Sequence, residues 1–190
     1  MNQKNILHPF LKPIKDLSEL IKVTNNKGII IGGIAASILG KPRFTSDVDV
    51  LILFQKDDIA GFIKQADLCG IIPRITNPIR FALKNKVILL KHKETGINID
   101  IAIGLLPFEH EIVNRSKIFD IEGIKINLPQ PEDLIILKAI AHRPMDLEDI
   151  RMIIKIYPRL DLKRIEKTVK EFASFLEMPE LWTDLTKILK

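Results

Sequence analysis

The sequence predicts an α+β fold followed by a helical region, and three stretches of the chain carry this prediction. Residues 28–53 have the pattern of a strand, a tight turn, a short helix, a loop and a second strand. Two more apolar runs, 86–92 and 97–103, are typical of strands joined by a hairpin-like turn that ends in glycine. From residue 129 onward the apolar side chains recur at helical spacing. Strands therefore belong to the first two thirds of the chain, and the last third is helical.

The remaining elements follow from the same patterns. Helical spacing predicts helices over residues 10–25, 57–68, 106–114, 132–142, 146–157, 161–177 and 179–189. Residues 116–121 and 124–128 are typical of a small hairpin. The segment 71–84 stays ambiguous, because Pro73 and Pro78 interrupt any regular element.

The run Pro129-Gln130-Pro131 is the best candidate for a domain boundary. Two prolines stop the preceding strand, and proline is well placed to start a helix. We expect one domain over residues 1–128 and a C-terminal helical region over residues 129–190.

The composition is that of an ordinary globular protein. Of the 190 residues, 46% are hydrophobic and 28% are charged, which is enough to bury a core. The net charge of +5 suits an anionic ligand such as a nucleotide or RNA but does not decide the function alone. Residues 1–16 lack the apolar core of a signal peptide, and the longest apolar run, 28–40, is too short to span a bilayer. We expect a cytoplasmic protein without a membrane partner.

Two aspartates on the second strand are the most informative residues of the chain. Asp47 and Asp49 are two positions apart, so they share one face of the strand. Two neighbouring like charges repel each other, and a divalent cation is the simplest compensation. Asp100, in the strand 97–103, is the obvious third carboxylate. We expect Asp47, Asp49 and Asp100 to be catalytic and to bind metal, with two Mg²⁺ ions or with Mn²⁺ in their place.

Four other residues are candidates for binding a nucleotide. Gly32 and Gly33 let backbone amides approach a triphosphate, and the helix that follows favours anions at its N-terminus. Ser37 lies one turn into that helix. Lys138 interrupts an otherwise apolar helix face, which predicts a contact with the phosphates.

Each of these signals also has a purely structural explanation. A Gly-Gly pair is common in ordinary tight turns, and an Asp-x-Asp pattern is common on solvent-exposed edge strands. A lysine such as Lys138 often extends its amino group to solvent. The combination is more specific than its parts. The spacer between Gly33 and Asp47 accommodates one short helix and a loop, which returns the carboxylates to the side of the glycines.

The combination resembles the DNA-polymerase-beta-like nucleotidyltransferase superfamily. Its signature is a Gly-Gly or Gly-Ser pair, a spacer, Asp-x-Asp or Asp-x-Glu on a strand and a third carboxylate on a later strand. Gly32-Gly33, Asp47, Asp49 and Asp100 occupy those places. The resemblance implies a nucleotidyltransferase fold, in which helices flank a mixed β-sheet and a helical subdomain follows. It also implies Mg²⁺-dependent transfer of a nucleoside monophosphate from a triphosphate such as ATP, with release of pyrophosphate.

Within the superfamily, the segment GKPRFTSDVDV is similar to the AbiEii-type toxin nucleotidyltransferases. In those proteins a helix carries a lysine, an arginine and an aspartate pair that helps to hold the active site. Lys138, Arg143, Asp146 and Asp149 match that order. From the residues alone, the last three are better explained as a structural set of ion pairs.

The resemblance leaves the acceptor open. It implies an RNA 3′ end such as that of tRNA, or a hydroxyl of a partner protein, and a toxin would have a cognate antitoxin. A small-molecule acceptor, as in antibiotic-modifying relatives, is a further possibility. One alternative from another class is a non-catalytic module that binds a nucleotide or partner on a degenerate nucleotidyltransferase fold. Another is a helical nucleic-acid-binding protein that uses its basic C-terminal residues Lys163, Arg164, Lys167 and Lys170.

Overall fold

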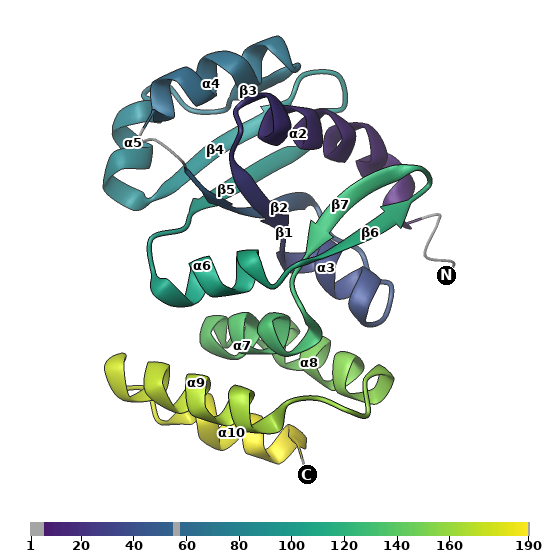
Figure 1. Cartoon of the computed structure of the whole chain (residues 1–190), viewed down its shortest axis with the longest axis vertical. Coiled ribbons are helices and arrows are strands. Elements are labelled where there is room, and N and C mark those ends of the chain that lie inside the picture. The colour runs from purple at the N-terminus through teal and green to yellow at the C-terminus, as the bar shows by residue number, and fades with distance from the viewer. Residues whose placement is uncertain (1–5, 55–57, 190) are drawn as a thin grey trace.

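A computed structural model describes residues 6–54 and 58–189 (Figure 1). Within them, five strands form one sheet in the order β1-β2-β5-β4-β3. The strands are β1 (Lys27–Ile30), β2 (Asp47–Leu53), β3 (Ile71–Pro73), β4 (Val87–His92) and β5 (Asn98–Ile103). β2 and β5 pair in parallel, whereas β1–β2, β5–β4 and β4–β3 are antiparallel. The predicted mixed sheet is confirmed.

Strand alternation in β2 divides the apolar side chains between the two faces of the sheet. Val48, Val50 and Ile52 join the main core, which also takes in α2 (Leu11–Val23) and α4 (Ile59–Leu68). The other face of the sheet packs against α6 (Pro107–Asn114) in a smaller cluster, which consists of Ile29, Leu51, Leu53, Ile112 and Val113. Because Asp47 and Asp49 are in phase with Leu51 and Leu53, they lie on the α6 face of the sheet.

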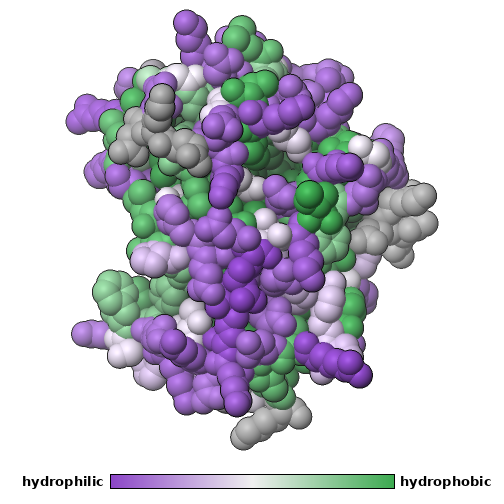
Figure 2. Space-filling model, viewed as in Figure 1, coloured by the Kyte–Doolittle hydropathy of each residue, from purple (hydrophilic) through white to green (hydrophobic). Residues whose placement is uncertain are grey.

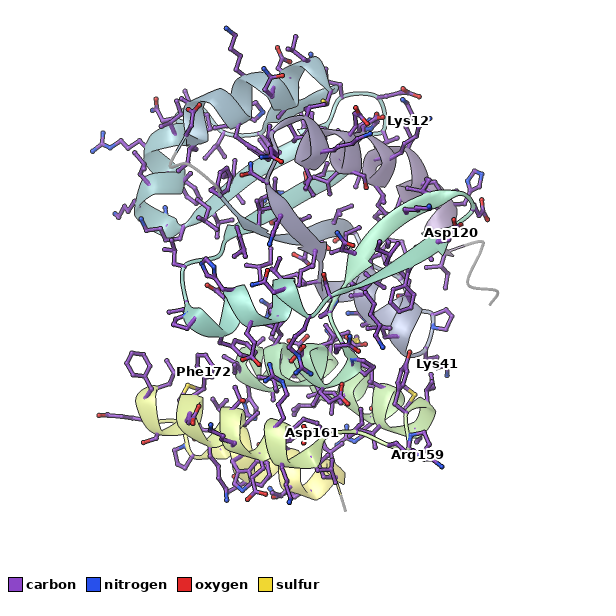
Figure 3. All side chains as sticks on the ribbon, in the orientation of Figure 1. Lys12, Lys41, Asp120, Arg159, Asp161 and Phe172 are labelled. Atoms are coloured by element: carbon purple, nitrogen blue, oxygen red, sulfur yellow. The ribbon has the colours of Figure 1, made fainter. Side chains whose placement is uncertain are left out.

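The C-terminal helices stack at one end of the molecule (Figure 1). They are α7 (Pro131–Ala141), α8 (Pro144–Ile156), α9 (Leu162–Phe175) and α10 (Glu180–Leu189). Phe172 of α9 packs edge-on against Phe108 of α6, with ring centroids 5.5 Å apart (Figure 3). Buried Leu134 and Ile150 belong to the same core as the sheet. The change from strand to helix comes where Pro129 and Pro131 predict it, while the division into two domains stays a prediction.

The predicted hairpin is present as β6 (Lys117–Ile121) and β7 (Ile124–Leu128). The ambiguous segment resolves into β3 and α5 (Pro78–Asn85). Pro73 ends an edge strand and Pro78 occupies the first turn of a helix, two places where a missing N–H is tolerated.

The start of α3 differs from the prediction. The sequence predicts a tight turn at Gly32-Gly33 before the helix, but α3 (Gly32–Leu39) already begins at the first glycine. The start of α4 was expected at Asp57 or Asp58. Asp57 lies outside the described residues, and the Asp58 carboxylate caps the helix by accepting a hydrogen bond from the Gly61 N–H at 2.7 Å.

Hydrophilic residues cover much of the face shown in Figure 2, which agrees with the burial of most apolar side chains inside. Across 6–54 and 58–189 the structure has no helix that is both long and apolar enough to cross a membrane.

Candidate active site

The two central strands place the three predicted carboxylates together. Asp49 on β2 lies directly opposite Asp100 on the parallel strand β5, and Asp47 lies opposite Asn98. Directly paired residues project from the same face of a sheet, and residues two apart on one strand do as well. Asp47, Asp49 and Asp100 therefore share one face, and all three are half-buried.

The glycine pair packs against these carboxylates. Gly32 has a φ of +62°, and a Cβ at this position would collide with the carboxylate of Asp49. The backbone N–H of Ile31 donates to the Asp49 carbonyl at 2.9 Å. A Cβ on Gly33 would lie 2.5 Å from Thr45 Oγ1, and this hydroxyl donates to Asp47 Oδ1 at 3.1 Å. The missing side chains thus make room for the two aspartates and their loop, beside the N-terminus of α3.

Burial and the crowding of negative charge both affect the pKa values of Asp49 and Asp100. Burial raises the pKa of Asp49, and the charges of Asp47 and Asp100 raise it further. Burial also raises the pKa of Asp100, although Arg74 opposes this rise. The folded chain holds these carboxyl groups in an environment that disfavours their ionised forms, and a bound cation would relieve that cost.

Arg74 is the residue at this site that the sequence did not single out. Its Nη2 atom lies 2.8 Å from Asp100 Oδ1 and donates a hydrogen bond to Oδ2 at 2.9 Å. Arg74 directly follows β3, and its backbone N–H donates to the Leu89 carbonyl on β4 at 3.1 Å. No local pattern signals this contact, because the pairing of strands far apart in sequence brings Arg74 toward Asp100.

Ser37 lies next to the glycines but is fully buried. Its hydroxyl donates to the Arg43 carbonyl at 3.1 Å and lies 3.4 Å from the Arg43 N–H. Ser37 thereby holds the loop between α3 and β2, and its predicted contact with a nucleotide stays a prediction.

Lys138 stands in a buried network instead of extending to solvent. Its Nζ lies 2.9 Å from Asp146 Oδ1 and 2.7 Å from Asp149 Oδ2, and the side chain is only 4% exposed. Asp149 also forms a two-point ion pair with Arg43, with Nε–Oδ1 at 2.7 Å and Nη2–Oδ2 at 2.8 Å. Arg143 lies at the edge of this network, 80% exposed and 3.8 Å from Asp146. Of the ion-pair set expected among Arg143, Asp146 and Asp149, the structure has the contact between Arg143 and Asp146, whereas Asp149 pairs with Lys138 and Arg43.

The chemistry of the donor set fits a hard divalent cation. Three carboxylates on one face supply the oxygen ligands that Mg²⁺ prefers. In the described part of the chain, however, no group of three His, Cys, Asp or Glu side chains is already arranged to hold a metal ion. Asp100 is paired with Arg74, so the guanidinium would compete with a cation for this carboxylate.

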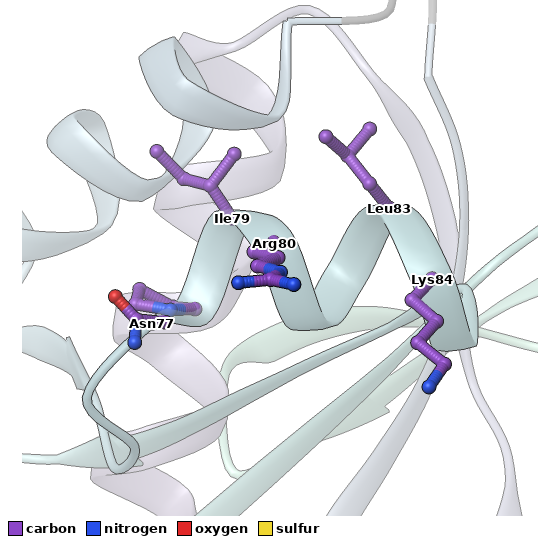
Figure 4. Close-up of a pocket in the computed structure, with 6 residues that line it drawn as sticks. Asn77, Ile79, Arg80, Leu83 and Lys84 are labelled. Atoms are coloured by element: carbon purple, nitrogen blue, oxygen red, sulfur yellow. The ribbon is translucent and has the colours of Figure 1, made fainter.

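A cavity of about 620 Å³ on α5 is separate from this chemistry. Residues 77–80, Leu83 and Lys84 line it, and none of the three aspartates does. Ile79 and Leu83 project from the same side of the helix (Figure 4). We place the candidate site on the half-exposed face of the sheet, where the carboxylates are.

Comparisons with solved structures agree with the fold. The crystal structure of ANT(2″)-Ia in complex with adenylyl-2″-tobramycin has a TM-score of 0.56 and 15% identity, over 93% of this chain and 99% of the other. The solution structure of the antibiotic-resistance factor ANT(2″)-Ia has a TM-score of 0.57 and 15% identity, over 94% and 95%. An antigenic nucleotidyltransferase-like protein from Paracoccidioides brasiliensis has a TM-score of 0.48 and 16% identity, over 93% and 92%. At 15% identity, the similarity to the two ANT(2″)-Ia structures concerns the fold alone.

No curated protein matches the sequence. A family model described as nucleotidyltransferase of unknown function (DUF6036) matches residues 9–184, which is nearly the whole chain. The shared face of Asp47, Asp49 and Asp100 and the adjoining glycine pair agree with that description. The chain belongs to this family of nucleotidyltransferases.

Proposed function

We propose that the protein is a metal-dependent enzyme that transfers a nucleoside monophosphate from a nucleoside triphosphate to an acceptor hydroxyl and releases pyrophosphate. One observation carries the proposal. Asp49 and Asp100 face each other on parallel strands, with Asp47 on the same face and Gly32 against Asp49.

In this proposal the three aspartates hold Mg²⁺, or Mn²⁺ in its place, and the metal neutralises charge on the phosphates. Asp100 is also placed to accept the proton of the incoming hydroxyl once Arg74 has released it. Gly32 and Gly33 present the backbone at the start of α3 to the triphosphate. Ser37 supports them through the loop that it anchors.

Two cations influence Asp49 without contacting it. The positive charges of Arg143 and Lys138 both lower the pKa of Asp49, against the larger effect of burial. Arg143 is exposed and weakly paired, whereas Lys138 is buried between two carboxylates. We assign the direct phosphate contact to Arg143 first, and to Lys138 only if its ion pairs rearrange on binding.

For the acceptor we propose an RNA 3′ end such as that of tRNA, or a hydroxyl of a partner protein. The three aspartates are only half-buried, and the net charge of +5 suits RNA. The similarity of residues 40–50 to AbiEii-type toxins supports the role of a toxin with a cognate antitoxin. A small-molecule hydroxyl is the second candidate, because a protein of the same fold, ANT(2″)-Ia, has a crystal structure in complex with adenylyl-2″-tobramycin.

The experiment supplies Mg²⁺ and each α-³²P-labelled triphosphate together with total RNA, total protein or an aminoglycoside such as tobramycin, and follows where the label goes. Asp47→Ala and Asp49→Ala are expected to abolish labelling. Asp120→Ala, on the exposed hairpin, is the matched control and is expected to retain it.

Full labelling by both site variants would overturn the catalytic assignment. If nucleotides with Mg²⁺ raise the melting temperature but no pool is labelled, the non-catalytic binding module is the better description.

A further inference from the structure

We propose that Arg74 couples metal binding to nucleotide binding: it neutralises Asp100 while no ligand is present, and it moves to the nucleotide phosphates when Asp100 binds metal. This inference rests on the proposed function and assigns a positioning role within it.

Strand pairing places Arg74 in the same row of the sheet as Asp100 and Asp49. The Arg74 N–H pairs with the carbonyl of Leu89, Leu89 lies opposite Asp100, and Asp100 lies opposite Asp49. These four residues form one row across the sheet. From the edge of the sheet, the Arg74 side chain reaches past Leu89 to the carboxylate of Asp100.

The ion pair is built in a way that permits exchange. The side chains of Arg74 and Asp100 are 24% and 29% exposed, and half-exposed ion pairs contribute little net stability. Only Nη2 contacts the carboxylate, and Asp100 Oδ1 has no hydrogen bond from any described residue. A guanidinium binds phosphate oxygens through two parallel hydrogen bonds, so a triphosphate offers Arg74 a better partner.

The ion pair between Arg74 and Asp100 offsets part of the negative charge of the three aspartates. Among the described residues, Asp100 is the one member of the trio that forms an ion pair, although all three share a face. Arg74 limits their mutual repulsion when no cation is bound. The same contact occupies a carboxylate that the metal needs, so the guanidinium and the metal compete for Asp100. A nucleotide that accepts Arg74 therefore strengthens metal binding, and by thermodynamic reciprocity the metal strengthens nucleotide binding.

The competing explanation is that Arg74 only anchors the edge strand β3. Replacement would then lower stability, but it would not change the coupling between metal and nucleotide. The two explanations differ in the metal affinity of the nucleotide-free protein.

The test measures Mn²⁺ binding to the full chain by electron paramagnetic resonance of the free ion, without nucleotide. Arg74→Gln is expected to bind Mn²⁺ about 5-fold or more tightly than the wild type, and to lose a comparable factor in affinity for an α,β-methylene ATP analogue in saturating Mn²⁺. Arg80→Gln removes the same charge from the exposed face of neighbouring α5 and is expected to change neither affinity. If Arg74→Gln does not fold, Arg74→Lys tests the phosphate contact: it keeps the charge and should bind Mn²⁺ as the wild type does, but without the planar fork it should lose affinity for the ATP analogue. Full affinity for the analogue would overturn the role of Arg74.

The outcomes separate this inference from the proposed function. In the first outcome, the wild type binds Mn²⁺ and Asp49→Asn removes this binding, but Arg74→Gln binds Mn²⁺ no more tightly than the wild type. This result overturns the role of Arg74 and leaves the proposed function intact. If the wild type binds Mn²⁺ no better than Asp49→Asn does, the metal-dependent function fails as well.

Discussion

Arg43 and Asp149 join the loop that precedes β2 to helix α8 through two hydrogen bonds of 2.7 and 2.8 Å. They are 106 residues apart in sequence, and Asp149 is also bonded to Lys138 on α7. The loop that leads into Asp47 and Asp49 is therefore fixed by the C-terminal helices. Stability and activity should depend on the same contact.

Asp149→Ala is expected to lower the free energy of unfolding by about 3–5 kcal/mol, because it leaves Lys138 buried with one partner fewer. Urea denaturation measures this change. Arg151→Ala breaks an exposed ion pair with Glu148 on the same helix and is the control, expected to stay within about 0.5 kcal/mol of the wild type. Equal losses in the two variants would contradict the role of the network.

Gly32→Ala is expected to destabilise the chain and to abolish nucleotidyl transfer. The left-handed backbone conformation alone costs an alanine roughly 1–2 kcal/mol, and the added methyl group displaces the Asp49 carboxylate. Gly96→Ala separates the two effects, since Gly96 has a φ of +72° with nothing near its Cβ position. It should lose only the roughly 1–2 kcal/mol of backbone strain and keep full transfer activity. A transfer assay beside urea denaturation tests both expectations.

Asp49→Asn is expected to stabilise the metal-free protein while removing activity. The folded-state pKa of Asp49 is raised, so the folded state binds a proton more tightly than the unfolded state. The stability that this proton contributes is complete below the unfolded pKa of 3.8 and is lost as the pH rises through the folded value.

Unfolding in EDTA between pH 3 and pH 7 measures the effect. At pH 7 the free energy of unfolding of Asp49→Asn should exceed that of the wild type by about 0.5–2 kcal/mol, which is the usual gain from removing an unfavourable charge. The difference should shrink at acid pH, and Glu171→Gln, on exposed surface, should follow the wild type. A variant less stable than the wild type at pH 7 would show that the carboxylate is not under electrostatic strain.

Arg143 and Lys138 should respond differently to neutralisation. Arg143→Gln is expected to raise the KM for the triphosphate roughly 10-fold, equivalent to about 1.4 kcal/mol, with little change in stability because the side chain is exposed. Lys138→Met is expected to destabilise the fold by about 3–5 kcal/mol, because it removes the buried cation that Asp146 and Asp149 share. Steady-state kinetics and urea denaturation on both variants check this. A KM defect confined to Lys138→Met would return the phosphate contact to the lysine.

The sequence predicted the centre of the fold well because that part is locally encoded. The alternation of Asp47 to Leu53 specifies the strand and its polar face, and β2 has these same bounds. The edge of the sheet could not be predicted in this way. The prolines at positions 73 and 78 concealed a three-residue strand and a helix, so the placement of Arg74 over Asp100 depended on a pairing that no local pattern contains.

The candidate site was likewise predictable from the sequence only in part. Asp47, Asp49 and Asp100 were found from their spacing and their strands, and the structure brings them to one face. The resemblance grouped Lys138 with Asp146 and Asp149, but the ion pairs of Lys138 with these two residues of α8 were not predicted. Ion pairs between elements depend on how the helices pack, and a one-dimensional pattern does not specify that.

The row that contains Arg74, Asp100 and Asp49 also runs from the border of the sheet to its middle. Strands β2 and β5 have hydrogen-bonded neighbours on both sides, whereas β3 is a three-residue border strand paired only with β4. Amide protons of such a border exchange with solvent long before those of central strands. The carboxylate pair thus lies on central strands, whereas the guanidinium that contacts it is attached to a border strand, where we expect earlier amide exchange.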